Sequence, residues 1–326
     1  MVSIHQLTLA LGSVLLSSWA LLCPPAAVAQ TTNVTRIVLA FPPGGPTDSL
    51  ARQIAEQLGV ELGQSIVIEN RPGGNGAVAA QFVLNAPNDG KTLWLTTAGA
   101  ITVNPGLYPK LAYDVKSFAP VSLLVNNQEV LVVNPKNPAN DPAQFIKEAM
   151  ANKNGLNITS SGIGSMPHMA IELLRDATGD HYTHIPNKGA APAITDVMGG
   201  QVDAFFGDIP GVLPFIQAGT LKAIAIASTK RFSLLPNVKT FDEIGVKGIY
   251  INNWSAMYVS KQVPVAVIDQ LNKAIVKTLT HKTVRDKLLA SGTDPEFSTP
   301  QEMANQAEEE TKVWRKLVQK YNIKAD

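Results

Sequence analysis

Two glycine-rich turns, far apart in the chain, carry the residues best suited to hold an anion. The first, FPPGGPTD, spans residues 41–48 and leads into an amphipathic segment. Its prolines fix the backbone, while Gly44 and Gly45 let a ligand approach the main chain closely. Thr47 or Asp48 can cap the following helix, which would leave other N–H groups of its first turn for an anion. A well-capped helix after a tight turn, with no ligand, is the competing interpretation.

The second turn, SSGIGSMPH at residues 160–168, has a similar composition. Gly162 and Gly164 lie between a β-rich run and a helical pattern, Ser165 stands near the helix start, and His168 follows three residues later. Backbone amides, a hydroxyl and a helix dipole, with no acid close by, suit a carboxylate. The two turns together therefore indicate a site for a small organic anion.

Catalysis by an exported hydrolase of similar α/β shape is the main alternative, because Ser165 and His168 could form a nucleophile and its base. The nucleophile-elbow pattern G-x-S-x-G is absent around Ser165, and the sequence identifies no third group to orient the histidine. GGNGAVA at 73–79 contains a degenerate dinucleotide fingerprint, but the acidic partner about 20 residues further on is missing. The histidines show no metal-type spacing with acids. We therefore expect a protein that is not an enzyme and uses neither cofactor nor metal.

The elements that must position these turns alternate between strand and helix patterns. Strand patterns lie at 35–41, 65–70, 91–97, 130–135, 156–160, 180–186, 202–208, 221–228 and 252–260. Helical patterns lie at 48–62, 76–86, 167–177 and 190–200, another begins at Asp141, and two or three long helices occupy 265–321. This alternation is typical of βαβ units. It predicts an α/β fold with two lobes, each a mostly parallel sheet flanked by helices.

The order of these patterns also predicts where the lobes divide. We assign residues 30–126 plus 253–326 to lobe 1 and residues 127–252 to lobe 2, with chain crossings near 125–130 and 250–254. Ligands of open α/β sheets bind at the carboxyl ends of strands and between domains. Both glycine-rich turns should then border one cleft.

The N-terminal 29 residues contain no Lys, Arg, Asp or Glu and end in Ala27-Val28-Ala29. An apolar run followed by small residues is typical of a secretory signal peptide, here cleaved after Ala29. A membrane anchor is the alternative, although the apolar run is shorter than the ~20 residues that a span needs. Cys23, the only cysteine, would be removed with the leader. Lipid attachment at Cys23 is disfavoured, because lipoprotein processing needs a small residue before the cysteine and Leu22 stands there.

The charge balance narrows the class of partner. The net charge is +1, with no basic block or stripe, so nucleic acid is not an expected partner. The mature chain from Gln30 would contain no cysteine, which suits an oxidising compartment and excludes disulfides. These features favour an exported protein that binds a small molecule.

Five motifs together resemble the Bug family, the periplasmic substrate-binding proteins of tripartite tricarboxylate transporters. They are FPPGGPTD, IENRPGGNG, SSGIGSMPH, THIPNKGAAPAITDVMGGQVDAFFGD and LKAIAIAS, and the likeness runs from about residue 36 to 321. The resemblance implies a Venus-flytrap fold in the periplasm. It implies a monomer that closes on a small mono- or dicarboxylate and delivers it to the membrane permease subunits of such a transporter. A partner of a membrane sensor would use the same pocket and stays an alternative.

The resemblance also implies the ligand-binding positions. They are Phe41, Pro43, Gly44, Gly45, Thr47, Asp48, Thr97, Ala98, Ser161, Gly164, Ser165, His168, Asn187, Ala190 and Asp208. Asn187 stands where the family often has an aromatic residue, which leaves room for a bulkier ligand, aromatic acids included. Asp208 should not contact the ligand carboxylate directly; water, a ligand amine or hydroxyl, or a helix N-terminus are its expected partners.

Overall fold

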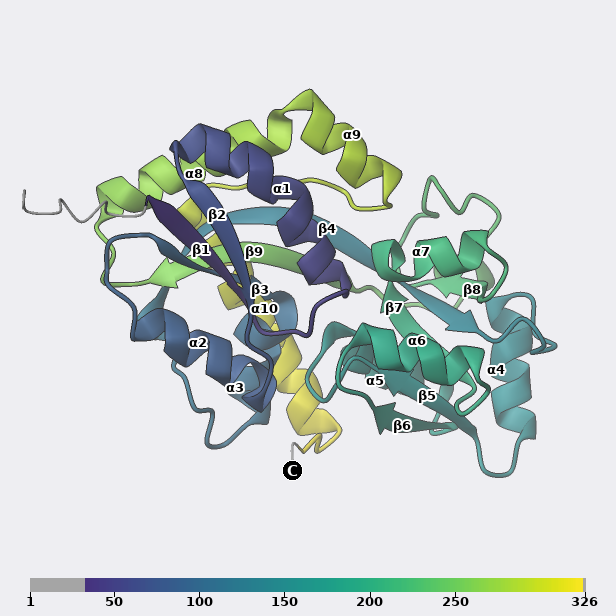
Figure 1. Cartoon of the computed structure of the whole chain (residues 1–326). Helices are drawn as coiled ribbons and strands as arrows, with labels where there is room; N and C mark the ends of the chain where they lie inside the picture. The colour runs from purple at the N-terminus through teal and green to yellow at the C-terminus, as the bar shows by residue number, and fades with distance from the viewer. Residues whose placement is uncertain (1–32, 325–326) are drawn as a thin grey trace, which may run out of the picture. The chain divides into compact units, whose positions relative to one another are not determined.

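The computed structural model describes residues 33–324, so the predicted signal peptide lies outside the described residues. We call lobe 1 the part built on strands β1, β2, β3 and β9, and lobe 2 the part built on β5 to β8 (Figure 1). Lobe 1 begins with β1 (Val34–Leu39), α1 (Pro46–Leu62), β2 (Ser65–Asn70), α2 (Ala77–Leu84), β3 (Thr92–Thr97), a π-helical turn (Gly99–Val103) and α3 (Asn104–Leu107).

The chain then crosses to lobe 2 on β4 (Phe118–Val133) and returns on β9 (Asn252–Ser260). Between them lie α4 (Pro142–Ala151), β5 (Leu156–Ser160), α5 (Met166–Thr178), β6 (Tyr182–Pro186), α6 (Ala190–Met198), β7 (Ala204–Asp208), α7 (Ile209–Gln217) and β8 (Lys222–Ile226). After β9 come α8 (Val265–Thr280), α9 (Lys282–Ala290) and α10 (Pro300–Lys320). The predicted strands therefore recur within a few residues, but β4 begins twelve residues before its predicted start at 130.

The described strands form a 9-stranded sheet in the order β2-β1-β3-β9-β4-β7-β5-β6, with β8 also paired to β4. Both lobes were expected to be mostly parallel, but each is mixed. β1 pairs in parallel with β2 and β3, and β5 with β6 and β7, whereas β4 and β9 pair antiparallel with all their neighbours. The reason is that β4 and β9 cross between the lobes in opposite directions.

β4 changes partner at one step of the chain. Gln128 is its last residue opposite β9, where it faces Asn252, and Glu129 is the first opposite β7, where it faces Asp208. One continuous strand thus belongs to both half-sheets. The point of exchange lies within the predicted crossing at 125–130.

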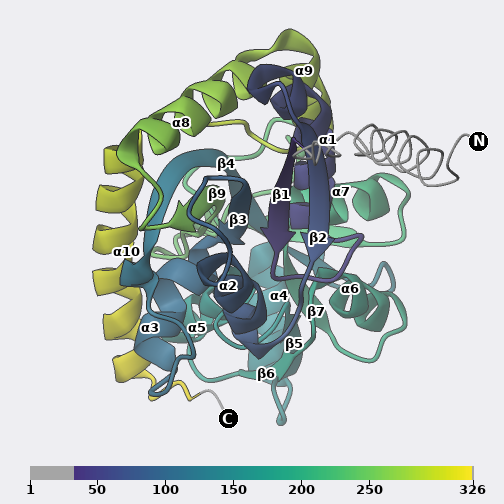
Figure 2. The same ribbon diagram turned by 60° about the vertical axis from the view of Figure 1, so that its left-hand side comes forward.

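Helices cover the half-sheet of lobe 1 on both faces (Figures 1 and 2). α1, α8 and α9 pack apolar side chains such as Ile54, Leu271 and Leu288 on one side, in one buried cluster with β1 and β3. On the other side α2 and α10 pack around Trp94 and Trp254, both fully buried. α10 begins at a capping box between Thr299 and Glu302, as its TPQE sequence favours. Among the described residues, no helix is long and apolar enough to cross a membrane.

Candidate functional site

The first glycine-rich turn is held in place by one carboxylate. Gly44, with φ +88°, donates its N–H to Asp48 Oδ2 at 3.0 Å. Arg52 donates to both oxygens of the same carboxylate, at 2.9 and 3.1 Å, and Asn70 Nδ2 donates to Oδ1 at 3.1 Å. Burial raises the pKa of Asp48, but the hydrogen bonds from Arg52, Gly44 and Asn70 outweigh it and lower that pKa overall. The Asp48 carboxylate is therefore ionised and engaged within the turn.

The expectation that Thr47 or Asp48 caps α1 is wrong. The N-cap is Gly45, and α1 begins at Pro46, whose fixed φ suits the first helical position. No side chain of the described residues caps this helix. The first backbone N–H with a bond inside the helix is that of Ser49, which donates to Gly45 O at 2.9 Å. The N–H groups of Thr47 and Asp48 precede that bond, so they are the two first-turn amides that an anion can use.

The second turn is stabilised by its own serine and histidine. Ser165 is the N-cap of α5: its Oγ accepts from His168 N at 3.4 Å and donates to Gly162 O at 2.7 Å. His168 Nδ1 accepts the Gly164 N–H at 3.1 Å, and its ring is buried and lies 3.5 Å from Glu172 Oε1. Both side chains thus fix the backbone of the turn.

A serine and a histidine do hydrogen-bond here, but not the pair suggested by the sequence. Ser160 Oγ and His184 Nε2 are 2.7 Å apart, and Ser160 is fully buried while its Oγ also bonds the backbone of Gly162 at 3.1 Å. Burial, followed by electrostatic interactions with His168 and Arg175, lowers the pKa of His184 to about 3. A buried serine beside a neutral histidine is a structural contact. Within residues 33–324, Ser165 Oγ bonds Gly162 O and the His168 backbone N–H, and no imidazole ring is placed to activate it.

The second turn contacts the π-helical turn of lobe 1. A Cβ added at Gly99 would lie 2.6 Å from Gly164 O in lobe 2. Reciprocally, a Cβ at Gly164 would lie 2.8 Å from both Asn104 Oδ1 and Leu107 Cδ2. Thr97 and Ala98, two predicted site residues, immediately precede Gly99. The backbones of the lobes are therefore in contact here, and glycine is required for so close an approach.

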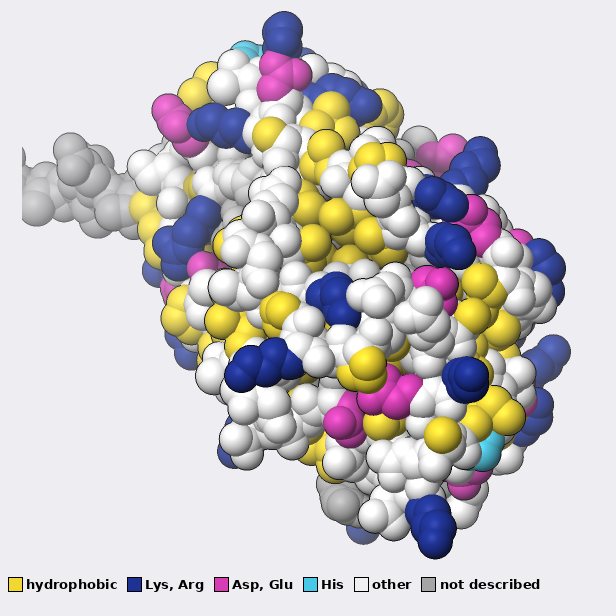
Figure 3. All heavy atoms as spheres, turned by 90° about the vertical axis from the view of Figure 1, so that its right-hand side faces the viewer, with side chains coloured by type: hydrophobic (Ala, Val, Ile, Leu, Met, Phe, Trp, Pro, Cys, Tyr) yellow, Lys and Arg dark blue, Asp and Glu magenta, His cyan; other side chains and the backbone are white. Residues whose placement is uncertain are grey.

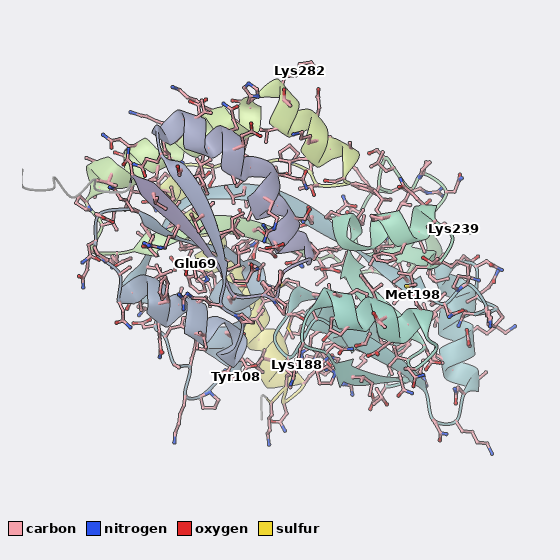
Figure 4. The ribbon with its side chains drawn as sticks, viewed as in Figure 1. Glu69, Tyr108, Lys188, Met198, Lys239 and Lys282 are labelled. Atoms are coloured by element: carbon pink, nitrogen blue, oxygen red, sulfur yellow. The ribbon has the colours of Figure 1, made fainter. Side chains whose placement is uncertain are left out.

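Two further contacts join the lobes beside the first turn. A Cβ at Gly211 in α7 would lie 2.7 Å from Pro46, and one at Gly189, the N-cap of α6, would lie 3.8 Å from Pro42. Tyr108 OH also donates to Ile163 O at 3.4 Å. Figure 4 labels Tyr108 of lobe 1 and Lys188 of the loop before α6. The starts of α1, α5, α6 and α7 therefore converge in a closed arrangement of the two lobes.

Asn187 and Ser161 belong to the loops of lobe 2 at this boundary. Asn187 Nδ2 donates to Asp196 Oδ2 at 2.6 Å and to Thr159 Oγ1 at 3.2 Å. The Gly189 N–H donates to Ser161 O at 3.0 Å, just before Ala190 begins α6. The Asn187 side chain is thus anchored within lobe 2.

Asp208 ends β7 and is the N-cap residue of α7, although its side chain does not cap that helix. Its Oδ1 accepts from Asn253 Nδ2 at 2.6 Å, and the same amide donates to Glu129 Oε1 at 2.8 Å. Glu129 and Asn253 are not among the site residues predicted from the sequence. The available signal was a single acid in β4, directly before the apolar run 130–133, which is the pattern of a buried and partnered carboxyl group.

The described residues hold no group of three or more His, Cys, Asp or Glu placed to bind a metal. The surface in Figure 3 shows Lys and Arg interspersed with Asp and Glu, without a continuous basic patch on that face. The site is therefore built from backbone amides, hydroxyls and one acid pair.

Known proteins share this architecture over most of the chain. The model of the tripartite tricarboxylate transporter family receptor matches residues 50–323. Protein BugT of Bordetella pertussis is 31% identical over 318 residues, which cover 97% of this chain and 98% of BugT.

Two solved structures, both from Rhodopseudomonas palustris, are also similar. MatC, with bound malate, is 31% identical with a TM-score of 0.81 and covers 87% of this chain and 99% of MatC. Rpa4515, with adipate, is 31% identical with a TM-score of 0.85 and covers 89% of this chain and 97% of Rpa4515.

These matches define a two-lobed solute-binding protein, as the sequence predicted. The chain belongs to the receptor family of tripartite tricarboxylate transporters. It is a receptor rather than an enzyme, and the predicted family is confirmed.

Proposed function

We propose that this receptor captures a small organic carboxylate between its lobes and delivers it to the membrane subunits of a tripartite tricarboxylate transporter. One observation carries the proposal: two glycine-rich turns that precede helix starts each contact the opposite lobe, the first at the starts of α6 and α7 and the second at the π-helical turn. Helix N-termini and backbone amides favour a carboxylate. Malate and adipate, the ligands of two relatives, belong to that class.

The ligand contacts in this proposal divide into two groups. Asp48 and His168 act by holding the two turns, because their polar atoms are already engaged there. The remaining predicted positions supply amides, hydroxyls and the walls of the site: Phe41, Pro43, Gly44, Gly45, Thr47, Thr97, Ala98, Ser161, Gly164, Ser165, Asn187, Ala190 and Asp208. The Thr47 N–H is the leading donor of lobe 1. In lobe 2 the Ser165 hydroxyl would exchange its bond to Gly162 O for one to the ligand.

The proposed lobe boundaries remain 30–126 plus 253–326 and 127–252. The change of β4 partner between Gln128 and Glu129 supports them, as does the start of β9 at Asn252. Hinge motion would then concentrate near 125–130 and 250–254, while each half-sheet moves as a body. A ligand that touches both turns binds the closed state better and shifts the population towards it.

Export to the periplasm as a monomer completes the proposal. We expect mass spectrometry of protein from a periplasmic extract to give an N-terminus at Gln30, because the uncharged leader ends in Ala27-Val28-Ala29. Light scattering on the same sample should give the mass of one mature chain. An intact Met1 or an acylated Cys23 at the N-terminus would contradict the processing, and a dimer mass would contradict the monomer.

Ligand binding can be tested with a panel of malate, adipate, citrate, benzoate and phthalate. At least one acid should raise the melting temperature, because a ligand that binds only the folded state stabilises it by about 2.7 kcal/mol at 100 times its Kd. The methyl esters of the same acids are the matched controls, since they lack the charge that the helix N-termini favour. Equal responses to acids and esters would contradict an anion site, and release of acid from the esters would revive the hydrolase alternative.

A further inference from the structure

Two carboxyl groups face each other where β4 passes from lobe 1 to lobe 2. Glu129 is fully buried and lies directly opposite Asp208 in the register of β4 and β7. The Asn253 amide, from the returning strand β9, donates to both side chains. Among the described residues, Glu129 Oε2 has no hydrogen-bond donor as a partner. Two ionised carboxylates sharing one amide would leave that buried oxygen unsatisfied.

One shared proton resolves this arrangement. Burial, the charge of Asp208 and a hydrogen bond with Asp208 raise the pKa of Glu129 well above its ordinary value, although Asn253 opposes them. Burial raises the pKa of Asp208 to about 6, against the hydrogen bonds from Glu129 and Asn253. At neutral pH the pair therefore retains a proton and carries a single negative charge.

Among the described residues, no Lys, Arg or His of the surrounding elements shifts the pKa of either acid. Other ionisable groups on the elements packed nearby are Tyr258 on β9, Lys222 on β8, Lys230 and Arg231 on the following loop, His168, Glu172 and Arg175 on α5, Asp294 and Glu296 beside β4, and Asp48 and Arg52 on α1. Arg52, Arg175 and Arg231 are already paired with carboxylates. Among the described residues, only the two acids and Asn253 shift the pKa of either member of the pair.

The pair lies close to the first glycine-rich turn, in lobe 1. Asp208 immediately precedes α7, and Gly211, three residues later, packs against Pro46 at the start of α1. An anion bound at the α1 N-terminus would therefore share the closed boundary with a negative charge. Because closure excludes water, their repulsion is stronger in the closed state than in bulk solvent.

We propose that capture of the carboxylate drives uptake of one proton by the Glu129–Asp208 pair, so that the receptor binds an anion together with a proton. This inference rests on the proposed carboxylate-binding function. The proton neutralises the pair when the anion arrives, and Asn253 positions both acids at the point where the lobes exchange strands. By linkage, affinity falls by up to about tenfold per pH unit above pH 6.

Calorimetry on the whole mature protein tests the coupling, with the tightest-binding acid of the panel as probe. Titrations at pH 7 in two buffers of different ionisation enthalpy give the number of protons taken up. We expect a value between zero and about one, with weaker affinity at pH 8 than at pH 6. Zero uptake in the wild type, with binding intact, overturns the proposal without touching the proposed function. Failure of every acid to bind overturns both.

Two variants assign the proton. Asp208→Asn should abolish the proton uptake. Its ligand affinity should no longer depend on pH and should equal the tight affinity that the wild type has at low pH, because the charge that opposes the anion is gone. Glu129→Gln should keep the uptake near neutral pH, since Asp208 can still be protonated. Asp286→Asn on exposed α9 is the matched control and should behave as wild type. Uptake that persists in Asp208→Asn would place the proton on another group and overturn the proposal. Weaker binding of Asp208→Asn at every pH would do the same, by making Asp208 an acceptor for a ligand hydroxyl or amine.

Discussion

Gly99→Ala should weaken ligand binding by about 10- to 100-fold while leaving the fold intact. Its new Cβ would lie 2.6 Å from Gly164 O across the lobe boundary, which is too close for any real contact. Gly99 does not have a left-handed φ, so alanine is compatible with the local backbone. Overpacking of this kind costs typically 1–3 kcal/mol, and here the cost falls on the closed state alone.

Calorimetry and solution scattering measure the two halves of this prediction. In the wild type, a saturating carboxylate should reduce the radius of gyration, and in Gly99→Ala that reduction should be smaller or absent. Gly106→Ala is the matched control: it lies in α3, and its Cβ would meet Arg315 at an ordinary 3.5 Å. Wild-type affinity and compaction in Gly99→Ala would show that the contact between Gly99 and Gly164 is not part of the bound state.

The alternation of apolar runs and helical periods was enough to predict most of the fold. β2, β5 and β9 occupy the predicted residues, because each is a short β-rich run bounded by turn residues. The first part of β4 was missed because FAPVSLLVNNQE contains a proline and five polar residues, a composition that does not predict a buried strand. The polar run at 126–129 lies where the strand exchanges partners, and pairing between distant strands is not encoded in local periodicity.

The candidate site was predictable as two turns but not as a set of contacts. Glycine, proline and serine revealed the turns, because these residues control local backbone geometry. The role of Asp48 depends on Asn70, 22 residues away, and that of Asp208 on Glu129 and Asn253. The close approach of Gly99 to Gly164 is equally invisible in the sequence, since it depends on how the two lobes pack.

Asp48→Asn should cost about 2–3 kcal/mol of unfolding free energy at pH 7 and weaken ligand binding about tenfold. The carboxylate accepts hydrogen bonds from Gly44, Arg52 and Asn70. An amide in its place has one acceptor oxygen instead of two, and its NH2 group would face other donors. A hydrogen bond to a charged group contributes about 1.5–3 kcal/mol. The affinity falls as well because the Gly44 N–H is released, so the backbone before α1 becomes less ordered.

The pH dependence of this loss has a defined sign. Because the folded pKa of Asp48 is lowered, its contribution is complete above the unfolded pKa of about 3.9 and is lost as pH falls through the folded value. Denaturant unfolding should therefore show a large gap between wild type and Asp48→Asn at pH 7 and a smaller one at pH 3. Asp269→Asn, at an exposed position of α8, controls for loss of one surface charge. An equal gap at both pH values would mean that the variant acts by steric disturbance of the turn, and an unchanged affinity would mean that Asp48 does not hold the turn for the ligand.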